Sequence, residues 1–178
     1  MAENININWQ KVPVEKAREI LRISEKYIEN QNLRLQQAEA RALGIAIVTA
    51  PYSLAVFGAS WILLTGNPPR VILGSILLGV GVALLSSAII SISTVLPGMF
   101  YVSGNTPENL LDKNDLEERN FAELIGEYVV FIQGAISNNL NVLQSRADRI
   151  RLSIYCIIVG APLLAILFCF IGWVFWRM

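Results

Sequence analysis

Three long stretches of this 178-residue chain contain no charged residue: 42–69, 71–107 and 152–176. Each is long enough to supply the roughly 20 mostly apolar residues with which a helix crosses a bilayer. A buried helix of a soluble protein is the alternative, but such helices seldom stay uncharged for so long, and hydrophobic residues make up 54% of this chain. The sequence therefore predicts an all-α membrane protein with three transmembrane helices.

The positions of the uncharged stretches divide the chain into spans and connecting segments. We expect, in order, a cytosolic N-terminal helix at 1–41, a first span at 42–65, a short external loop at 66–70, a second span at 71–96, a cytosolic loop and helix at 97–151, a third span at 152–176 and an external C-terminus at 177–178.

The distribution of Lys and Arg predicts the orientation. Most of these residues precede the first span or lie between the second and third, whereas the short loop offers only Arg70 and the C-terminus only Arg177. Positively charged loops stay in the cytosol, so the N-terminus is expected inside and the C-terminus outside. Trp61, Trp173 and Trp176 fit an aromatic belt at the outer face.

Long helices are expected to lead into the first and third spans. After Pro13, residues at three-four spacing form a seam that continues into the first span: Val14, Ala17, Leu21, Ser24, Ile28, Gln31, Leu35, Ala38 and Ala42. A second helix is expected near Asp115, after a turn-rich part at 98–114, with its own seam: Phe121, Ile125, Tyr128, Ile132, Ile136, Leu140, Leu143, Ala147, Ile150 and Ile154. Both helices should enter their spans without a break, and Pro51 and Pro162 should kink the first and third spans.

The second span carries a ladder of small residues at every fourth position: Ser75, Gly79, Ala83, Ser87 and Ser91. Small residues allow two helix backbones to approach closely, and Ser hydroxyls can hydrogen-bond across the contact. Three interpretations remain open: packing against another span of the same chain, self-association into a homo-oligomer, or lining of a hydrated pore.

The residues that most enzymes and metal sites need are scarce. The chain has no His, and its two cysteines, Cys156 and Cys169, are about 20 Å apart along one helix, too far to form a disulfide. The common hydrolase, kinase and phosphate-loop signatures are absent. We expect no catalytic activity, no metal, no cofactor and no nucleic-acid partner; the lipid bilayer is the expected partner.

Basic residues gather where the third span begins. Such arginines ordinarily set orientation and attract anionic lipids. The sharper interpretation is a pocket for a phosphate-bearing ligand, because guanidinium groups bind phosphate with two parallel hydrogen bonds. The candidate residues of this pocket are Arg41, Asn138, Asn139, Gln144, Arg146, Arg149 and Arg151.

Three short motifs occur in a characteristic order. Ala38-Glu39-Ala40-Arg41-Ala42 precedes the first span, Leu96-Pro97 closes the second, and Asn138-Asn139-Leu140 leads through Arg151 into the third. This order resembles the Pycsar transmembrane effectors of bacterial cyclic-nucleotide antiphage defence, in which Asp and Lys are more usual than the Glu and Arg of the first motif. A sister family of two-span or three-span immunity effectors is similar.

The resemblance implies a function that composition alone does not indicate. It implies a membrane effector that oligomerises after a cyclic-nucleotide signal and impairs or permeabilises the bacterial inner membrane, so that infection is aborted. Two other classes remain open: a structural or accessory subunit of a larger membrane complex, and a small channel or carrier. Both would show the same three spans and the same small-residue ladder.

Overall fold

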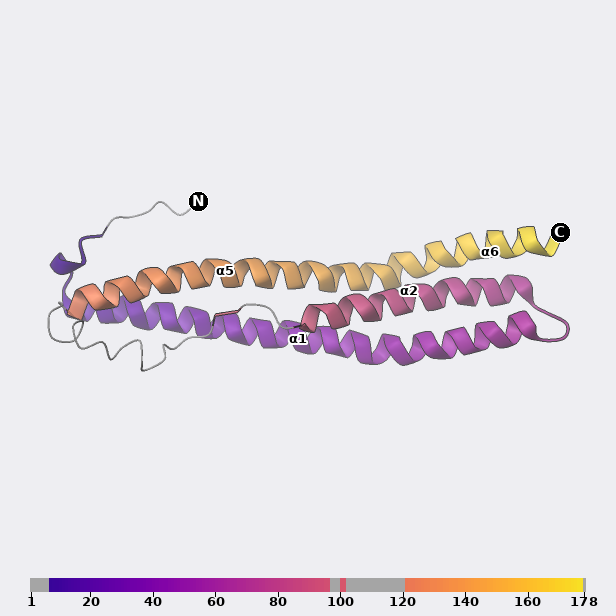
Figure 1. Cartoon of the computed structure of the whole chain (residues 1–178), viewed down its shortest axis with the longest axis horizontal. Coiled ribbons are helices and arrows are strands. Elements are labelled where there is room, and N and C mark those ends of the chain that lie inside the picture. The colour runs from indigo at the N-terminus through magenta and orange to yellow at the C-terminus, as the bar shows by residue number, and fades with distance from the viewer. Residues whose placement is uncertain (1–6, 97–99, 102–120, 178) are drawn as a thin grey trace. The chain divides into compact units, whose positions relative to one another are not determined.

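The computed structural model describes residues 7–96, 100–101 and 121–177, except for the side chains of Phe175 and Trp176. The described residues form helices and no strand (Figure 1). The elements are a 3-10 helix at Trp9–Lys11, α1 at Val14–Thr65, α2 at Val71–Val95, α5 at Phe121–Tyr155, a π-helical segment at Cys156–Gly160 and α6 at Ala161–Arg177.

Three helical stretches are long and apolar enough to cross a membrane: Val14–Thr65, Val71–Val95 and Phe121–Val174. The prediction of an all-helical chain with three such stretches is therefore confirmed. The predicted start of a helix near Asp115, most of the turn-rich part, Pro97 and the Trp176 side chain lie outside what the structure describes.

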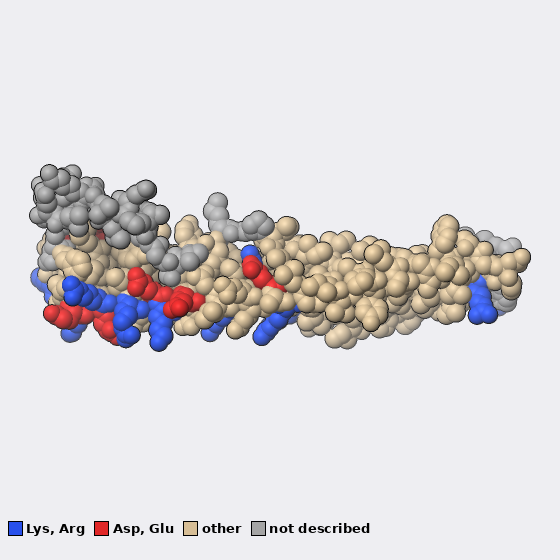
Figure 2. Space-filling view, turned by 90° about the horizontal axis from the view of Figure 1, so that it is seen from below, with Lys and Arg blue, Asp and Glu red and all other residues tan. Residues whose placement is uncertain are grey.

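The chain forms two compact units, and α1 and α5 contribute residues to both. One, the polar unit, comprises residues 1–35 and 98–143; the other, the apolar unit, comprises 36–97 and 144–178. Figure 2 shows Lys, Arg, Asp and Glu gathered over the polar unit, whereas the same face of the apolar unit carries few charged side chains. This difference follows the distribution of charge along the sequence.

In the polar unit, α1 and α5 pack through two apolar clusters. The clusters are Ala17 with Ala122 and Ile125, and Ile28 with Ile132 and Ala135. Gln31, also buried, donates from Nε2 to the carbonyl oxygen of Ile136 at 3.2 Å. Trp9 packs so closely on Gly126 that a Cβ there would lie 2.3 Å from the indole ring. Every position of the predicted α1 seam is buried or half-buried, so this seam is confirmed.

The predicted seam of α5 is only partly correct. Ile125 and Ile132 are buried, but farther along the helix the buried residues are the polar Asn139, Arg146 and Ser153. Each precedes an exposed residue of the predicted seam: Leu140, Ala147 and Ile154. The true contact face is thus turned by one residue, about 100° around the helix. The prediction assumed that only apolar residues are buried. These three polar side chains are buried as well, because each has a hydrogen-bond partner inside the fold.

In the apolar unit, α2 packs against α6 and against the π-helical segment. Its other face meets α1, where the Ser60 hydroxyl donates to the carbonyl oxygen of Gly74 at 2.7 Å and Gly81 lies against the ring of Phe57. Apart from Arg146, every buried residue that the structure describes in this unit is Gly, Ala, Ser or Thr. Large apolar side chains such as Ile47 and Ile166 face outward, as expected of helices in hydrocarbon.

The third candidate span is not one uniform α-helix. Between α5 and α6, the backbone N–H of Ala161 bonds to the carbonyl oxygen of Cys156, five residues earlier, which defines a π turn. Pro162 follows directly; it has no N–H, and its ring crowds the preceding turn of an α-helix. α5 continues through the predicted start of the span at 152 to Tyr155, so the expectation that this helix enters its span without a break is confirmed. The π turn lies farther along, next to Pro162, whereas Pro51 lies within the continuous α1.

Candidate functional site

A single guanidinium group of α5 contacts α1 and the residue that follows α2. Arg146 of α5 is 6% exposed, and its Nη1 donates to the Glu39 carboxylate of α1. Its Nη2 donates to the carbonyl oxygen of Leu96, directly after α2, at 3.4 Å. We call this set of Glu39, Leu96 and Arg146 the Arg146 junction. The guanidinium group is planar, permanently charged and carries five N–H donors in a fixed fork, so one side chain can reach two separate acceptors.

The Arg146 junction combines a shielded cation with a carboxylate that solvent still reaches. The Arg146 side chain is 8% exposed and that of Glu39 is 32% exposed. Exposed ion pairs contribute less than about 1 kcal/mol, whereas removing one partner of a fully buried pair costs about 3–5 kcal/mol. The contribution of the Glu39–Arg146 pair to stability lies between these limits. The pair stabilises the junction, and its solvent-accessible side is that of Glu39.

Arg149, one turn farther along α5, binds the end of α2. Its Nη1 donates to the carbonyl oxygen of Ser93 at 2.9 Å. The last four carbonyl groups of a helix have no partner within the helix, and the helix dipole makes this end favourable for cations. Arg146 and Arg149 together therefore cap the C-terminal end of α2.

A cluster of three serines follows on the same face of α5. The Ser153 hydroxyl lies 2.7 Å from the hydroxyls of both Ser87 and Ser91 and also donates to the Ser87 carbonyl oxygen at 3.1 Å. All three side chains are fully buried. Each hydroxyl has a partner, as buried polar groups require.

The small-residue ladder of α2 faces the third candidate span of the same chain. Besides Ser87 and Ser91, Gly79 lies so close to α6 that a Cβ there would be 2.6 Å from the Leu164 carbonyl oxygen. Ser75 lies against Gly172, and Ala83 is buried. The ladder therefore serves helix packing within the chain. Lining a pore with these residues would require this interface to open.

The other residues proposed for a phosphate pocket have different surroundings. Arg41, Gln144 and Arg151 are exposed, and Arg151 lies 3.9 Å from Asp148. Asn139 is fully buried in the polar unit; it accepts from the Tyr101 N–H at 2.9 Å and donates to the Tyr101 carbonyl oxygen at 2.8 Å.

Asn138 is half-buried and already has an interaction partner. It belongs with Asn139 to the polar unit, whereas the five other candidates belong to the apolar unit. Within the apolar unit, the structure brings Arg146 and Arg149 together at the end of α2. The phosphate pocket itself stays a prediction.

Sequence reasoning missed three members of this network: Glu39 as the partner of Arg146, Ser93 as an acceptor, and Ser153. One available signal was the seven-residue spacing of Asn139, Arg146 and Ser153, which places three polar groups on one helical face. A second was the position of Glu39 three residues before Ala42, a member of the α1 seam.

Among the described residues, no group of three or more His, Cys, Asp or Glu side chains is placed to hold a metal ion. Cys156 and Cys169 are free thiols. Comparison of the chain with protein-family models, with curated proteins and with solved structures finds no match. The resemblance described above therefore rests on the quoted motifs alone.

Proposed function

We propose that this chain is a bacterial inner-membrane effector that, when triggered by a phosphate-bearing nucleotide, self-associates and impairs the membrane. The N-terminus lies in the cytoplasm and the C-terminus outside. The observation that carries the proposal is the Arg146 junction, in which one guanidinium links α1, the end of α2 and α5. A change at this one group reaches all three spans.

The chemistry of the junction suggests how a nucleotide would act. Phosphate and carboxylate compete for the same guanidinium donors. The solvent-accessible side of Glu39 and the exposed Arg41, Arg149 and Arg151 offer a phosphate both access and further cations. A phosphate that displaced Glu39 would break the ion pair that links α1 to α5 in the apolar unit. The small-residue faces of the spans would then be free to pack against other copies.

The first test follows membrane potential in cells that express the chain with and without phage infection. Wild type should depolarise the membrane only after infection. Glu39→Gln, which weakens the contact with Arg146, should depolarise it without phage, whereas Glu29→Gln, an exposed site on α1, should behave as wild type. If potential, permeability and growth stay normal for wild type and for Glu39→Gln, the effector proposal is wrong.

The second test addresses the trigger. Purified chain in vesicles is exposed to each of the four cyclic 3′,5′-mononucleotides while dye leakage is recorded. One nucleotide should cause leakage, and Arg149→Ala should raise the concentration required, because it removes an exposed cation beside the junction. An unchanged response of Arg149→Ala would limit this arginine to orientation and capping of α2.

One observation favours a second function, that of an accessory subunit in a larger membrane complex. The ladder hydroxyls of Ser87 and Ser91 are satisfied by Ser153 of the same chain, so the bundle needs no second copy to bury them. Size measurement of the detergent-purified protein, alone and with the activating nucleotide, separates the two functions. A monomer under both conditions favours the accessory subunit, and a nucleotide-dependent oligomer favours the effector.

A further inference from the structure

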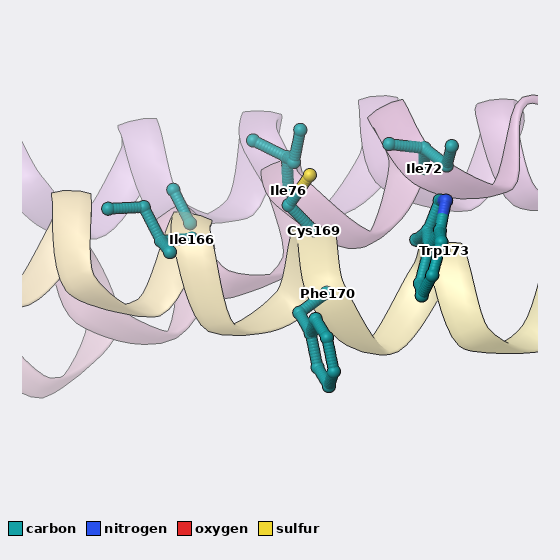
Figure 3. Close-up of a pocket in the computed structure, with 7 residues that line it drawn as sticks. Ile72, Ile76, Ile166, Cys169, Phe170 and Trp173 are labelled. Carbon is teal, nitrogen blue, oxygen red and sulfur yellow. The ribbon is translucent and has the colours of Figure 1, made fainter.

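An apolar groove runs along α2 and α6, well away in sequence from the Arg146 junction. Its volume is about 490 Å³. Its main lining residues are Ile72 and Ile76 of α2 and Ile166, Cys169, Phe170 and Trp173 of α6 (Figure 3). Figure 3 shows Cys169 and Trp173 directed toward α2, whereas Phe170 points away from it. The Phe170 and Trp173 rings lie 6.1 Å apart, centroid to centroid.

A second, smaller cavity adjoins the groove and is lined in part by a positively charged side chain. Its volume is about 290 Å³; it shares Ile72 and Ile76 with the groove and is also lined by Arg70. Arg70 directly precedes α2, whose N-terminal N–H groups and positive dipole end favour anions. The guanidinium of Arg177, at the end of α6, lies 4.2 Å from the centroid of the Trp173 ring.

Within the described part of the chain, neither arginine forms a salt bridge with an acidic side chain. The sequence has no Asp or Glu from 40 to 107 and none after 148. The groove therefore combines an almost entirely apolar wall with the positive charge of Arg70 and Arg177 at one end. Its complement is a molecule with an apolar tail and an anionic head.

A second copy of this chain is a poor occupant. A symmetric pair places the same surface on both partners, so contact through the groove would bring Arg70 and Arg177 toward their own counterparts. The groove is also short: the eight residue steps from Ala165 to Trp173 span about 12 Å along α6, a fraction of the length of a membrane-crossing helix.

We propose that this groove binds an anionic phospholipid, with one acyl chain along Ile76, Ile166 and Cys169 and the phosphate at Arg70 and Arg177. The acyl chain fills the apolar space between α2 and α6. The phosphate accepts hydrogen bonds from the guanidinium groups. One wall of the groove belongs to α2 and the other to α6. A lipid that contacts both walls therefore stabilises the contact between these two helices.

Trp173 offers a direct readout because it lines the groove. The full-length chain carrying Trp61→Phe and Trp176→Phe is reconstituted in phosphatidylcholine vesicles with a small fraction of phosphatidylglycerol. Bromine is placed on the acyl chains of one lipid or the other, at equal mole fraction, and quenches tryptophan on contact. Trp9 is retained because it packs on Gly126, and its emission is subtracted with a matched Trp173→Phe chain.

Brominated phosphatidylglycerol should quench Trp173 several-fold more than brominated phosphatidylcholine. Arg70→Gln with Arg177→Gln should reduce the two to equal quenching, and Arg70→Lys with Arg177→Lys should restore most of the preference. A matched chain that keeps Trp61, 69% exposed on α1, in place of Trp173 should report equal quenching by both lipids.

Three results would overturn the proposal. Equal quenching of Trp173 by the two lipids would mean that the groove only meets bulk lipid. A preference that survives Arg70→Gln with Arg177→Gln would mean that the cations do not select the lipid. Absence of quenching together with crosslinking between copies through Cys169 would mean that another copy fills the groove. None of these results depends on the response to nucleotide or phage.

Discussion

The two units of this chain close their helix contacts in opposite ways. In the polar unit the contact between α1 and α5 is filled by large side chains, chiefly Ile28, Ile125 and Ile132. In the apolar unit the buried residues, Arg146 excepted, are small, and hydroxyl groups such as that of Ser153 bond across the contact.

The difference is the one expected if the apolar unit spans a bilayer and the polar unit lies in water. In water, burying an isoleucine removes apolar surface from solvent, which stabilises the contact. In hydrocarbon the same burial gains almost nothing, so helices associate through close backbone approach and hydrogen bonds. Ile47, Leu54 and Ile166 of the apolar unit face outward, and such exposed apolar side chains are what contact with lipid requires.

The largest effect is expected in the polar unit when buried volume is removed. Ile132→Ala should destabilise the contact of α1 with α5 by about 3 kcal/mol, because Ile132 is 2% exposed and truncation leaves a cavity. Amide hydrogen exchange along the polar part of α5 should accelerate about 100-fold. Val130→Ala, at a 59% exposed site on the same helix, should change exchange little. If the two variants accelerated exchange equally, buried side-chain volume would not be what stabilises the contact between α1 and α5.

In the apolar unit, added volume should be the damaging change. Gly79→Ala should cost about 2 kcal/mol, because the new methyl group meets the Leu164 backbone, which cannot move aside as a side chain would. Gly58→Ala, where no atom lies within 4 Å of the added methyl group, should be tolerated. Unfolding of the detergent-purified variants in increasing sodium dodecyl sulfate measures both. A tolerated Gly79→Ala would contradict close packing of α2 on α6.

A smaller effect is expected from the serine cluster. Ser153→Ala should destabilise the apolar unit by about 1 kcal/mol, since membrane-buried hydrogen bonds are individually modest and the freed hydroxyls can turn to their own helix. Ser86 already bonds in that way, to the Val82 carbonyl oxygen. Ser93→Ala is the control because its hydroxyl bonds only within α2. In the same detergent unfolding experiment, Ser93→Ala should be as stable as wild type. An equal loss of stability in both variants would show that the interhelical hydrogen bonds of Ser153 do not stabilise the unit.

The smallest effect concerns an exposed ion pair of the polar unit. A hydrogen bond from Arg22 holds the pKa of Glu19 below its ordinary value. A lowered pKa means that the pair stabilises the fold above the unfolded-state pKa and that this contribution disappears as pH falls through the folded-state pKa. Arg22→Ala should raise the pKa of Glu19, measured by NMR titration of its side-chain carbon, with little change in stability near neutral pH. An unaltered pKa would show that the contact does not persist in solution.

Much of the fold could be predicted from the sequence because the deciding features are local. Uncharged length identified three helices able to cross a membrane, and the three-four spacing of apolar and small residues found the contact face of α1 from Val14 to Ala42. The small-residue ladder marked the face of α2 on which another helix packs. In each case a residue's type and its spacing along one helix are enough.

The tertiary structure alone decided which partner each face meets. Arg146 bonds to Glu39, 107 positions away, and Ser153 bonds to Ser87, 66 positions away. A hydroxyl such as that of Ser53 can be buried on a hydrogen bond within its own helix. Asn139, Arg146 and Ser153 instead bond to groups far away in the sequence, so their burial cannot be predicted from α5 alone. For this reason the buried residues of α5 agree with the apolar seam at Ile125 and Ile132 but lie one residue before it at Asn139, Arg146 and Ser153.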